Sequence, residues 1–310
     1  MLRKFNVLIL VIICSNLNSF SNEVKSDSSI FVDYFIEGVM NLELFQDYEQ
    51  ALLSLDKAIN LFEYNSKLNY NNNFISQEFE SLYVSKAYQS RAICHEYFEN
   101  YKNSIEDINL AIFYYNKLYL PVSSHYFQRA QIYSRLDDFQ LAADDYSSGL
   151  IIDYDIMSLY KRGVCYYFLG FYDEAISDLS IAIDSISDSR LLQARGNCFL
   201  KTSKYLSAVN DFSSSLKIKN DAEVFYSRAI AFAFLRSYEN SCKDFKRACS
   251  LGYEFACNQI LDKNGVCFID NTSVFEKVNN KNNLQNKFVL PIFSEGDMKF
   301  IFISFSGKKI

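Results

Sequence analysis

The chain has 310 residues, of which 49% are hydrophobic, and a net charge of −6 at pH 7. This acidic balance disfavours non-specific binding to nucleic acid, whose phosphates repel an anionic surface. Aromatic residues make up 16% of the chain without a single tryptophan, and most of these Tyr and Phe residues recur at regular intervals, so we expect them to form a core.

The first 21 residues have the pattern of a signal peptide. Two basic residues precede an apolar run from Phe5 to Cys14, and polar residues follow it. The run is about ten residues long, too short to span a bilayer. Small residues at Ser19–Ser21 allow cleavage before Asn22. We therefore predict a signal peptide over residues 1–21 and an exported protein, periplasmic or at the cell surface; an uncleaved N-terminal core segment is the alternative.

Cys14 gives the same segment a second interpretation. It follows Val11–Ile13, and together these residues resemble a weak lipobox, the lipidation motif of bacterial lipoproteins. Those proteins usually carry a small residue at the place of Ile13. Lipidation at Cys14 would anchor the chain to a membrane, and we expect no membrane association without it.

Between Ser85 and Ser250 the chain repeats itself, and an Arg–Asp pair marks every copy. Each Arg lies sixteen residues before its Asp; the pairs recur every 33 residues from Arg129 onward, after a first interval of 38. Self-similarity at this period predicts a stack of supersecondary units rather than one globular core. The pairs are Arg91–Asp107, Arg129–Asp145, Arg162–Asp178, Arg195–Asp211 and Arg228–Asp244.

Each copy contains two stretches of helical periodicity separated by a turn. In residues 159–183 the apolar residues recur three and four apart on both sides of Gly170. Neither helix can bury its apolar stripe alone, so we predict antiparallel helix pairs that stack on one another. The small residues Gly163 and Ala175 let the two helices approach closely. A looser copy over residues 35–58 lacks the Arg–Asp pair and fits a capping repeat.

This pattern resembles that of tetratricopeptide-repeat (TPR) proteins. The order of small, aromatic and alanine positions across residues 32–251 is similar to the family's two-helix signature, although the usual proline after the second helix is missing. Instead, Asp155, Asp188 and Asp221 precede three of the first helices, where a carboxylate can cap exposed N–H groups. The resemblance implies an all-α fold, a right-handed α/α superhelical solenoid of about six helix pairs over residues 32–262.

The Arg–Asp pairs themselves have two interpretations, a row of structural ion pairs or a phosphate-binding surface. In an antiparallel hairpin whose turn lies midway between them, each Arg faces its own Asp across the helix pair. The loosest copy lacks both residues together. We therefore favour an ion pair within each repeat, which fixes the register of the hairpin more than it adds stability.

The remaining cysteines occupy two kinds of position. Cys249 and Cys257 lie eight apart across a turn, a pattern that resembles the C-x7-C brace of secreted cysteine-rich α/α-repeat proteins. That resemblance implies a disulfide in an oxidising compartment. Two free thiols are the alternative, and Cys242 could pair with Cys267, although no spacing demands it. Three more cysteines share a first-helix column of small buried residues and are expected to be packing residues: Cys94, Cys165 and Cys198.

The segment after the last repeat differs from the rest of the chain. Tyr253–Leu261 predicts a final helix that covers the last pair, and residues 263–310 begin as a polar linker. Phe288–Phe293 and Met298–Phe305 then predict the two strands of a β-hairpin. Because a lone hairpin is only marginally stable in water, we expect it to pack on the solenoid or to pair with a partner.

The TPR resemblance implies that an extended peptide or a partner helix binds in a concave groove lined by the first helices. The predicted lining carries aromatic and cationic side chains, which suit a partner segment with apolar anchors and some acidity. The alternative is that several of the aromatics pack against a neighbouring helix. The predicted lining is Phe127, Tyr160, Lys161, Tyr167, Phe168, Arg190, Gln193, Asn197, Lys201, Tyr226 and Phe234, with Lys86 and Arg135 adding positive charge and Glu96 and Glu223 opposing it.

No catalytic constellation is found in the sequence. It has no Gly-rich phosphate loop, and His95 and His125 lie in separate repeats without the spacing of metal ligands. We therefore predict no enzyme, no cofactor and no metal. The first functional hypothesis is an exported, non-catalytic scaffold for protein–protein interaction; the alternative is a periplasmic or surface binder of a small ligand or glycan that stacks on groove aromatics. A clamp for a chain-terminal carboxylate is disfavoured, because only Asn197 matches it.

Overall fold

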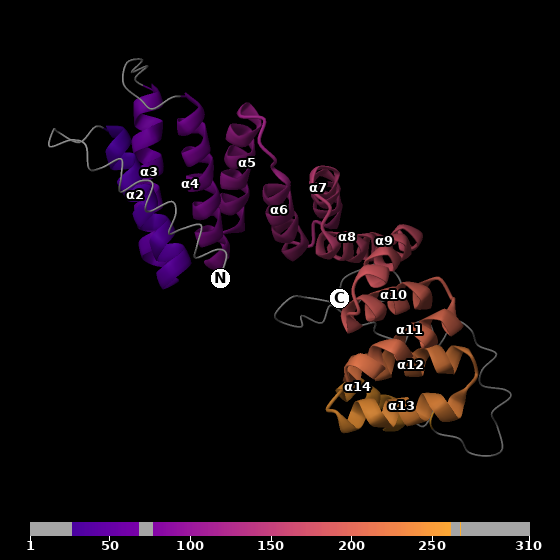
Figure 1. Cartoon of the computed structure of the whole chain (residues 1–310). Helices are drawn as coiled ribbons and strands as arrows, with labels where there is room; N and C mark the ends of the chain where they lie inside the picture. The colour runs from indigo at the N-terminus through magenta and orange to yellow at the C-terminus, as the bar shows by residue number, and fades with distance from the viewer. Residues whose placement is uncertain (1–26, 68–76, 262–266, 268–310) are drawn as a thin grey trace. The chain divides into compact units, whose positions relative to one another are not determined.

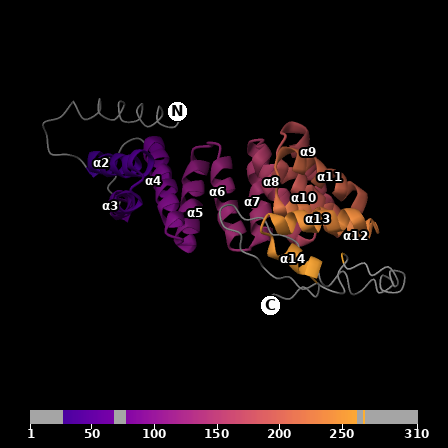
Figure 2. The ribbon, with the colours of Figure 1, turned by 90° about the horizontal axis from the view of Figure 1, so that it is seen from below.

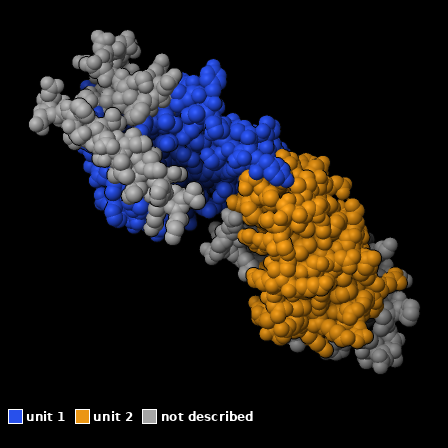
Figure 3. All heavy atoms as spheres, viewed as in Figure 1, with its two compact units in different colours: residues 1–154 blue, residues 155–310 orange. Residues whose placement is uncertain are grey.

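The structure, a computed structural model, describes residues 27–67, 77–261 and Cys267. The predicted signal peptide, Cys14 and the predicted β-hairpin lie outside these residues. Within them the chain is helical, with thirteen α-helices, one π-helical turn and no strand. They belong to two compact units, residues 1–154 and 155–310 (Figure 3).

Unit 1 consists of three helix pairs, which Figures 1 and 2 show side by side in chain order. Helices α2 and α3, α4 and α5, and α6 and α7 form the pairs, and α3 contacts α4 while α5 contacts α6. The pairs therefore stack. The elements are α2 (Asp27–Met40), the π-helical turn η1 (Asn41–Phe45), α3 (Tyr48–Lys67), α4 (Gln77–Tyr97), α5 (Tyr101–Lys117), α6 (Ser123–Arg135) and α7 (Phe139–Ile152).

Unit 2 consists of three further pairs and a single closing helix (Figure 1). The pairs are α8 with α9, α10 with α11 and α12 with α13, and α14 packs on α13. The predicted all-α fold of stacked helix pairs is thus confirmed. The elements are α8 (Ile156–Leu169), α9 (Tyr172–Ser185), α10 (Ser189–Lys201), α11 (Tyr205–Ile218), α12 (Ala222–Phe234), α13 (Tyr238–Ser250) and α14 (Glu254–Leu261).

Each first helix of unit 2 begins at an aspartate that caps it, as the sequence predicted. The Asp side chain accepts a hydrogen bond from a backbone N–H of the first turn, which otherwise has no partner within the helix. This fixes where the helix starts, every 33 residues. The bonds run from Ser158 N to Asp155 at 2.6 Å, from Arg190 N to Asp188 at 2.8 Å and from Glu223 N to Asp221 at 3.0 Å.

Small side chains allow the two helices of a pair to pack closely. A Cβ atom added to Gly196 on α10 would lie 2.6 Å from Cε1 of Phe212 on α11, so the ring occupies the space that a side chain would need. Cys94, Cys165 and Cys198 are buried, in keeping with their predicted packing role. Burial raises the pKa of the Cys94 and Cys198 thiols to about 12, so both stay protonated at neutral pH.

The five Arg–Asp pairs are bidentate ion pairs within each hairpin, which confirms the structural interpretation. In every pair Nε and Nη2 of the Arg donate to the two carboxylate oxygens of the Asp, at 2.7–2.9 Å. Each guanidinium also lies over an aromatic ring; that of Arg195, for example, is 5.7 Å from the centroid of Phe199. Arginine suits such stacking better than lysine does, because its guanidinium group is planar.

Within each unit, a third contact of the arginines links helix pairs to the pair before them, and no pattern in the sequence predicted it. Nη1 of Arg195 donates to the hydroxyl of Ser180 on α9 at 3.0 Å, and Nη1 of Arg228 donates to Ser213 on α11 at 3.0 Å. In unit 1, Arg91 reaches Asp56 on α3 at 2.8 Å in the same way. The arginines therefore bond both within a repeat and between repeats.

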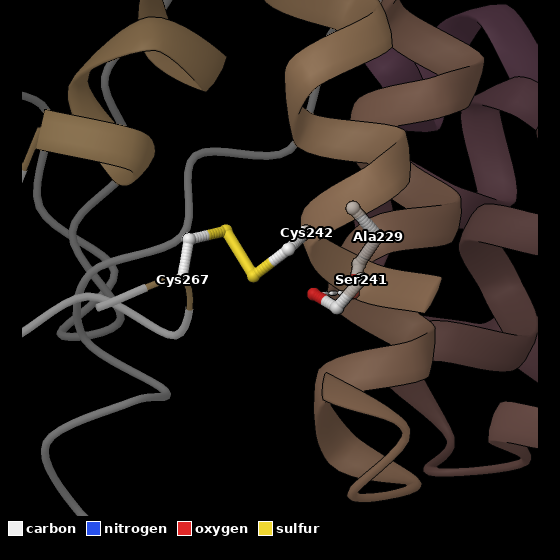
Figure 4. The surroundings of a disulfide bond; sticks show 4 residues. All are labelled: Ala229, Ser241, Cys242 and Cys267. Carbon is white, nitrogen blue, oxygen red and sulfur yellow. Dashed lines mark hydrogen bonds between the residues drawn. A yellow bond between two sulfur atoms is a disulfide. The ribbon is translucent and has the colours of Figure 1, made fainter. Parts of the chain in front are cut away.

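Two cysteine pairs lie close together around α13. The Cα atoms of Cys249 and Cys257 are 4.8 Å apart and those of Cys242 and Cys267 are 5.2 Å apart, both within the range of disulfides. Figure 4 shows Cys242 projecting from α13 toward Cys267, next to Ser241. The first pair lies between the end of α13 and α14, and the second lies between α13 and Cys267.

Candidate partner-binding face

The first helices of unit 2 lie together, because α10 contacts both α8 and α12. Residues 33 apart occupy equivalent places on them, so that Tyr160, Gln193 and Tyr226 form one column. We call the surface formed by α8, α10 and α12 the first-helix face. It comprises Tyr160, Lys161, Tyr167 and Phe168 on α8, Arg190, Gln193, Asn197 and Lys201 on α10, and Glu223, Tyr226, Ser227 and Phe234 on α12.

The predicted groove residues of unit 2 differ widely in exposure. The side chain of Arg190 is 53% exposed. Lys161, Tyr167, Phe168, Lys201 and Phe234 are half-buried, whereas Tyr160, Gln193, Asn197 and Tyr226 are buried. The ring of Tyr226 lies 5.5 Å from Phe245 and 5.0 Å from Tyr253, which cover it. This ring therefore packs against neighbouring helices, as the alternative interpretation of the aromatics held.

Phe127 lies in unit 1. It is half-buried on α6, and its ring occupies the space above Gly149 on α7, 6.4 Å from the ring of Tyr146. It thus packs within its own helix pair. Arg135, also in unit 1, pairs with Glu96 at 3.3 Å.

The first-helix face is less cationic than its sequence suggested. Arg190 donates from Nη2 to its own cap residue, Asp188, at 2.8 Å, so a local carboxylate already balances its charge. Burial also lowers the pKa of the Lys201 ammonium group. An acidic partner is therefore supported less well by the structure than by the sequence.

Buried polar atoms without a hydrogen-bond partner mark the boundary between α10 and α12. Among the described residues, Asn197 is 0% exposed and neither its Oδ1 nor its Nδ2 has a partner. The hydroxyl of Ser227, also 0% exposed, has none either, nor has Oε1 of Glu223. Each such atom costs about 1–3 kcal/mol, and they are rare in folded proteins. The face therefore has hydrogen-bonding capacity that its own fold does not use.

The carboxyl group of Glu223 on this face has a raised pKa. Its pKa is raised to about 7, chiefly by desolvation and then by the charge of Asp221, while Gln193, which hydrogen-bonds it, and Lys219 act in the opposite direction. Burial, followed by the Glu223 charge, raises the pKa of Tyr253. Glu223, Gln193 and Tyr253 thus form one interacting group drawn from α12, α10 and the residue before α14.

Sequence reasoning counted Glu223 only as a charge opposing the cations and missed Ser227 altogether. A signal was present for one residue of the group. Asn197 stands in a column whose members on α8 and α12 are Val164 and Ile230, so a polar amide replaces an apolar side chain there. For Ser227 there was no such signal, because serine is common throughout the chain.

The described residues contain neither a metal-binding cluster nor a membrane-spanning helix. Residues 27–67 and 77–261 contain no group of three or more His, Cys, Asp or Glu side chains that could hold a metal ion. Of the helices described, none combines the length and apolar character needed to cross a bilayer.

Solved structures with a similar fold are TPR proteins. The chain is similar to YrrB, described as a TPR protein with an unusual peptide-binding site, with 14% identity and a TM-score of 0.50 over 56% of this chain and 90% of that one. The chain has a TPR-like helical-repeat fold. MamA from Desulfovibrio magneticus RS-1 matches at 11% identity and a TM-score of 0.52, over 55% of this chain and 96% of that one.

A third similar structure covers more of the chain. The C-terminal part of a TPR repeat-containing protein from Cytophaga hutchinsonii matches with 18% identity and a TM-score of 0.52, over 70% of this chain and 80% of that one. No protein-family model and no curated protein matches the sequence. At these identities the likeness concerns the fold alone.

Proposed function

We propose that the protein is an exported, non-catalytic scaffold that binds a segment of a partner protein on the first-helix face of unit 2. The observation that carries this proposal is the buried amide of Asn197, whose donor and acceptor both lack a partner in the described structure. A peptide group supplies one acceptor and one donor, which match this amide once a partner displaces the side chains that cover it. Tyr167, Phe168 and Phe234 on the same face are half-buried and would add apolar contacts.

The fold is compatible with this role. Stacked helix pairs create extended surfaces suited to binding other chains. YrrB, which shares the fold, is described as having a peptide-binding site. The glycan-binding alternative is weaker, because two of its stacking platforms, Tyr160 and Tyr226, are buried.

Export is supported by the signal-peptide pattern of residues 1–21 and by the two cysteine pairs. We propose that Cys249–Cys257 and Cys242–Cys267 are disulfides in the mature protein, since an oxidising compartment would form and keep them. Mass spectrometry of the protein from its native cells, without reduction, tests this. It would also show whether Cys14 is removed with the leader or lipidated.

The test of partner binding is crosslinking and affinity capture of the tagged full chain from its native cells. Asn197→Leu is the variant of choice, because an apolar side chain of similar size removes the unpartnered amide without opening a cavity. We expect the variant to melt at the same or a higher temperature and to lose the captured partner. Asn210→Leu, on the exposed side of α11, is the matched control and should keep it.

Reversing two charges provides a second variant. Lys161→Glu combined with Lys201→Glu should reduce capture if the partner crosses the whole face, and circular dichroism will show whether the fold is kept. A partner captured equally by wild type, Asn197→Leu and the charge-reversed variant would contradict binding at this face. Capture of no protein at all would favour the small-ligand alternative.

A further inference from the structure

We propose that the turns within the first two helix pairs of unit 1 together bind a cationic segment of a partner protein, one that carries arginine or lysine side chains. We call this surface the turn edge; it comprises residues 43–49 and 96–102. The inference goes beyond the proposed function, which concerns a face of unit 2.

Exposed aromatic rings from both pairs meet at the turn edge. The ring of Tyr48, at the start of α3, stacks on that of Tyr97, at the end of α4, with the two centroids 3.8 Å apart. The ring of Phe98 lies edge-on to Tyr97, at 5.2 Å. Tyr97 is nevertheless 60% exposed and Phe98 41%. The rings therefore join the two pairs and still leave aromatic surface open to solvent.

Phe45 adds a further ring. In each turn one residue adopts the left-handed conformation, Gln46 in the first pair and Glu99 in the second. Phe45 and Phe98 both immediately precede that residue, so they occupy equivalent places on neighbouring pairs. Helices α2 and α4, which lead into the two turns, are in contact, and packed helices lie about 8–10 Å apart. Phe45, which is 66% exposed, thus lies about one helix spacing from Phe98.

The fold does not require rings at these two places. The stack itself belongs to the packing, because Tyr205 and Phe234 make the same contact in unit 2 at 4.6 Å. Before the left-handed residue, however, the pairs of unit 2 carry Leu169, Thr202 and Leu235. Exposed rings that the helix pair does not need are typical of surfaces that bind another molecule.

The charge around the rings selects the kind of molecule. Within residues 43–49 and 96–102, Lys102 is the one cation, and Glu96 is already paired with Arg135 at 3.3 Å. Four further carboxylates are exposed there, and none has an ion-pair partner among the described residues: Glu43, Asp47, Glu49 and Glu99. The turn edge is therefore aromatic and acidic.

Acidity is not a property of this kind of turn. In unit 2, Lys204 follows the left-handed Ser203, and Arg236 is itself the left-handed residue of its turn. Lys204 also pairs with Asp173 at 3.6 Å, so that carboxylate is partly balanced by the chain's own charge. Acidic turns with exposed rings thus distinguish the first two pairs of unit 1.

A guanidinium or ammonium group matches this combination. Its charge is attracted to the face of an aromatic ring and to a nearby carboxylate at once. The chain uses the same chemistry internally: the guanidinium of Arg91 lies 5.6 Å from the centroid of Tyr88 and bonds Asp107 at 2.7 Å. An anionic segment would be repelled by the four carboxylates.

The experiment uses the full chain and two short peptides. The first is acetyl-Gly-Arg-Gly-Gly-Arg-Gly-amide, whose arginines lie about 10 Å apart in an extended chain, close to the separation of neighbouring pairs. The second has citrulline, which is neutral and nearly isosteric, in place of both arginines. Isothermal titration calorimetry at low and at physiological salt measures binding.

We expect the arginine peptide to bind, with an affinity that falls as salt is added, and the citrulline peptide to bind at least about tenfold more weakly. A triple variant, Glu43→Gln with Glu49→Gln and Glu99→Gln, should weaken binding of the arginine peptide about tenfold or more. Its matched control removes three exposed carboxylates from unit 2 and should bind as wild type does: Asp173→Asn, Glu174→Gln and Glu239→Gln. Both variants have the same net charge, so the comparison separates the turn edge from the overall charge of the chain.

The rings are tested by Phe45→Ser combined with Phe98→Ser. Because neither side chain is buried, this variant should melt close to wild type, and it should lose most of its affinity for the arginine peptide. Leu235→Ser, at the equivalent place in unit 2, is the control and should keep that affinity.

Several outcomes would overturn the inference. These are equal binding of the two peptides, equal losses in the two charge variants, binding unchanged without the two rings, or no binding at millimolar peptide. A neutral oligosaccharide that binds in place of the arginine peptide, and is lost with Phe45 and Phe98, would assign the rings to a sugar. Failure of the proposed function is distinct, because it is measured with variants of unit 2.

Discussion

The two units contain the same kind of helix pair, yet unit 2 is built far more regularly than unit 1. Its six paired helices are all 13 or 14 residues long, and each first helix starts at a capping Asp. In unit 1, α3, α4 and α5 have 20, 21 and 17 residues, a π-helical turn follows α2, and no side chain caps α5, α6 or α7.

The difference bears on how the unpartnered polar atoms should be interpreted. In unit 1 they belong to side chains on different helix pairs, namely His95 on α4 and His125 and Gln128 on α6. Burial lowers the pKa of His125 to about 4, so it stays neutral at physiological pH. In unit 2 they gather where α10 meets α12. This clustering in an otherwise regular unit is what the proposed binding face would produce.

The largest expected effect concerns the arginine contacts. Asp211→Ala would leave Arg195, whose side chain is 20% exposed, without its bidentate partner, and we expect a loss of about 3 kcal/mol in unfolding free energy. Asp56→Ala in unit 1 should cost less than about 1 kcal/mol, because Asp56 is 43% exposed and Arg91 keeps Asp107. Urea denaturation followed by circular dichroism measures both. Equal losses would show that the contact between repeats matters as much as the contact within them.

The second effect tests how evenly unit 2 is packed. Gly196→Ala would drive a methyl group into the ring of Phe212 and should cost about 1–3 kcal/mol. Gly163→Ala should cost less, since its Cβ would lie 3.1 Å from Cγ of Leu179, an aliphatic side chain that can shift. Melting temperatures of the two variants give the comparison. A larger loss at Gly163 would mean that the α8–α9 pair is the more tightly packed.

The third prediction compares capping in the two units. Asp188→Ala removes a cap bond and should cost about 1 kcal/mol, whereas Asp138→Ala, at the start of α7 where no side-chain cap bond forms, should cost almost nothing. The hydrogen bond from Arg190 lowers the pKa of Asp188. Its contribution is therefore complete above the pKa of an unfolded Asp and is lost as pH falls through the lower, folded pKa. Urea titrations of wild type and Asp188→Ala should converge at acidic pH.

The smallest effect concerns the turn within each pair, where one residue must adopt the left-handed backbone conformation. Gly170 provides it at φ +84°, but Arg236 adopts φ 60° and Glu99 in unit 1 adopts φ 58°. Glycine has no steric penalty there, so Arg236→Gly and Glu99→Gly should each stabilise the chain by up to about 1 kcal/mol. Gly170→Ala should destabilise by a similar amount. Thermal melts resolve these differences, and a loss of stability in Arg236→Gly would contradict the argument.

The features that recur with the 33-residue period could be predicted from the sequence. The Arg–Asp pairs and the capping aspartates recur at fixed spacing, so a helix-pair geometry assigns their roles directly. The backward contacts of the arginines were not predictable, because their acceptors change from Asp56 to Ser180 and Ser213 and leave no common motif.

The candidate site was predicted less well than the fold. Helical projection places Tyr226 and Asn197 on the first-helix face, but their exposure depends on what packs beside them. Tyr226 is covered by Tyr253, which lies beyond the last repeat, and Asn197 is fully buried. The pattern of a single repeat does not encode either degree of burial.

The direction of the arginine contacts has a consequence for how the chain is made. In the bonds described, each guanidinium reaches back to a helix nearer the N-terminus, as Arg195 does to Ser180 and Arg228 to Ser213. When a polypeptide emerges from the ribosome, the acceptor of each link is thus synthesised before its donor. Each new hairpin can therefore dock on helices that have already been synthesised, so unit 2 can assemble one pair at a time during translation. In a chain interrupted after a pair, the acceptors of these arginine bonds are already present.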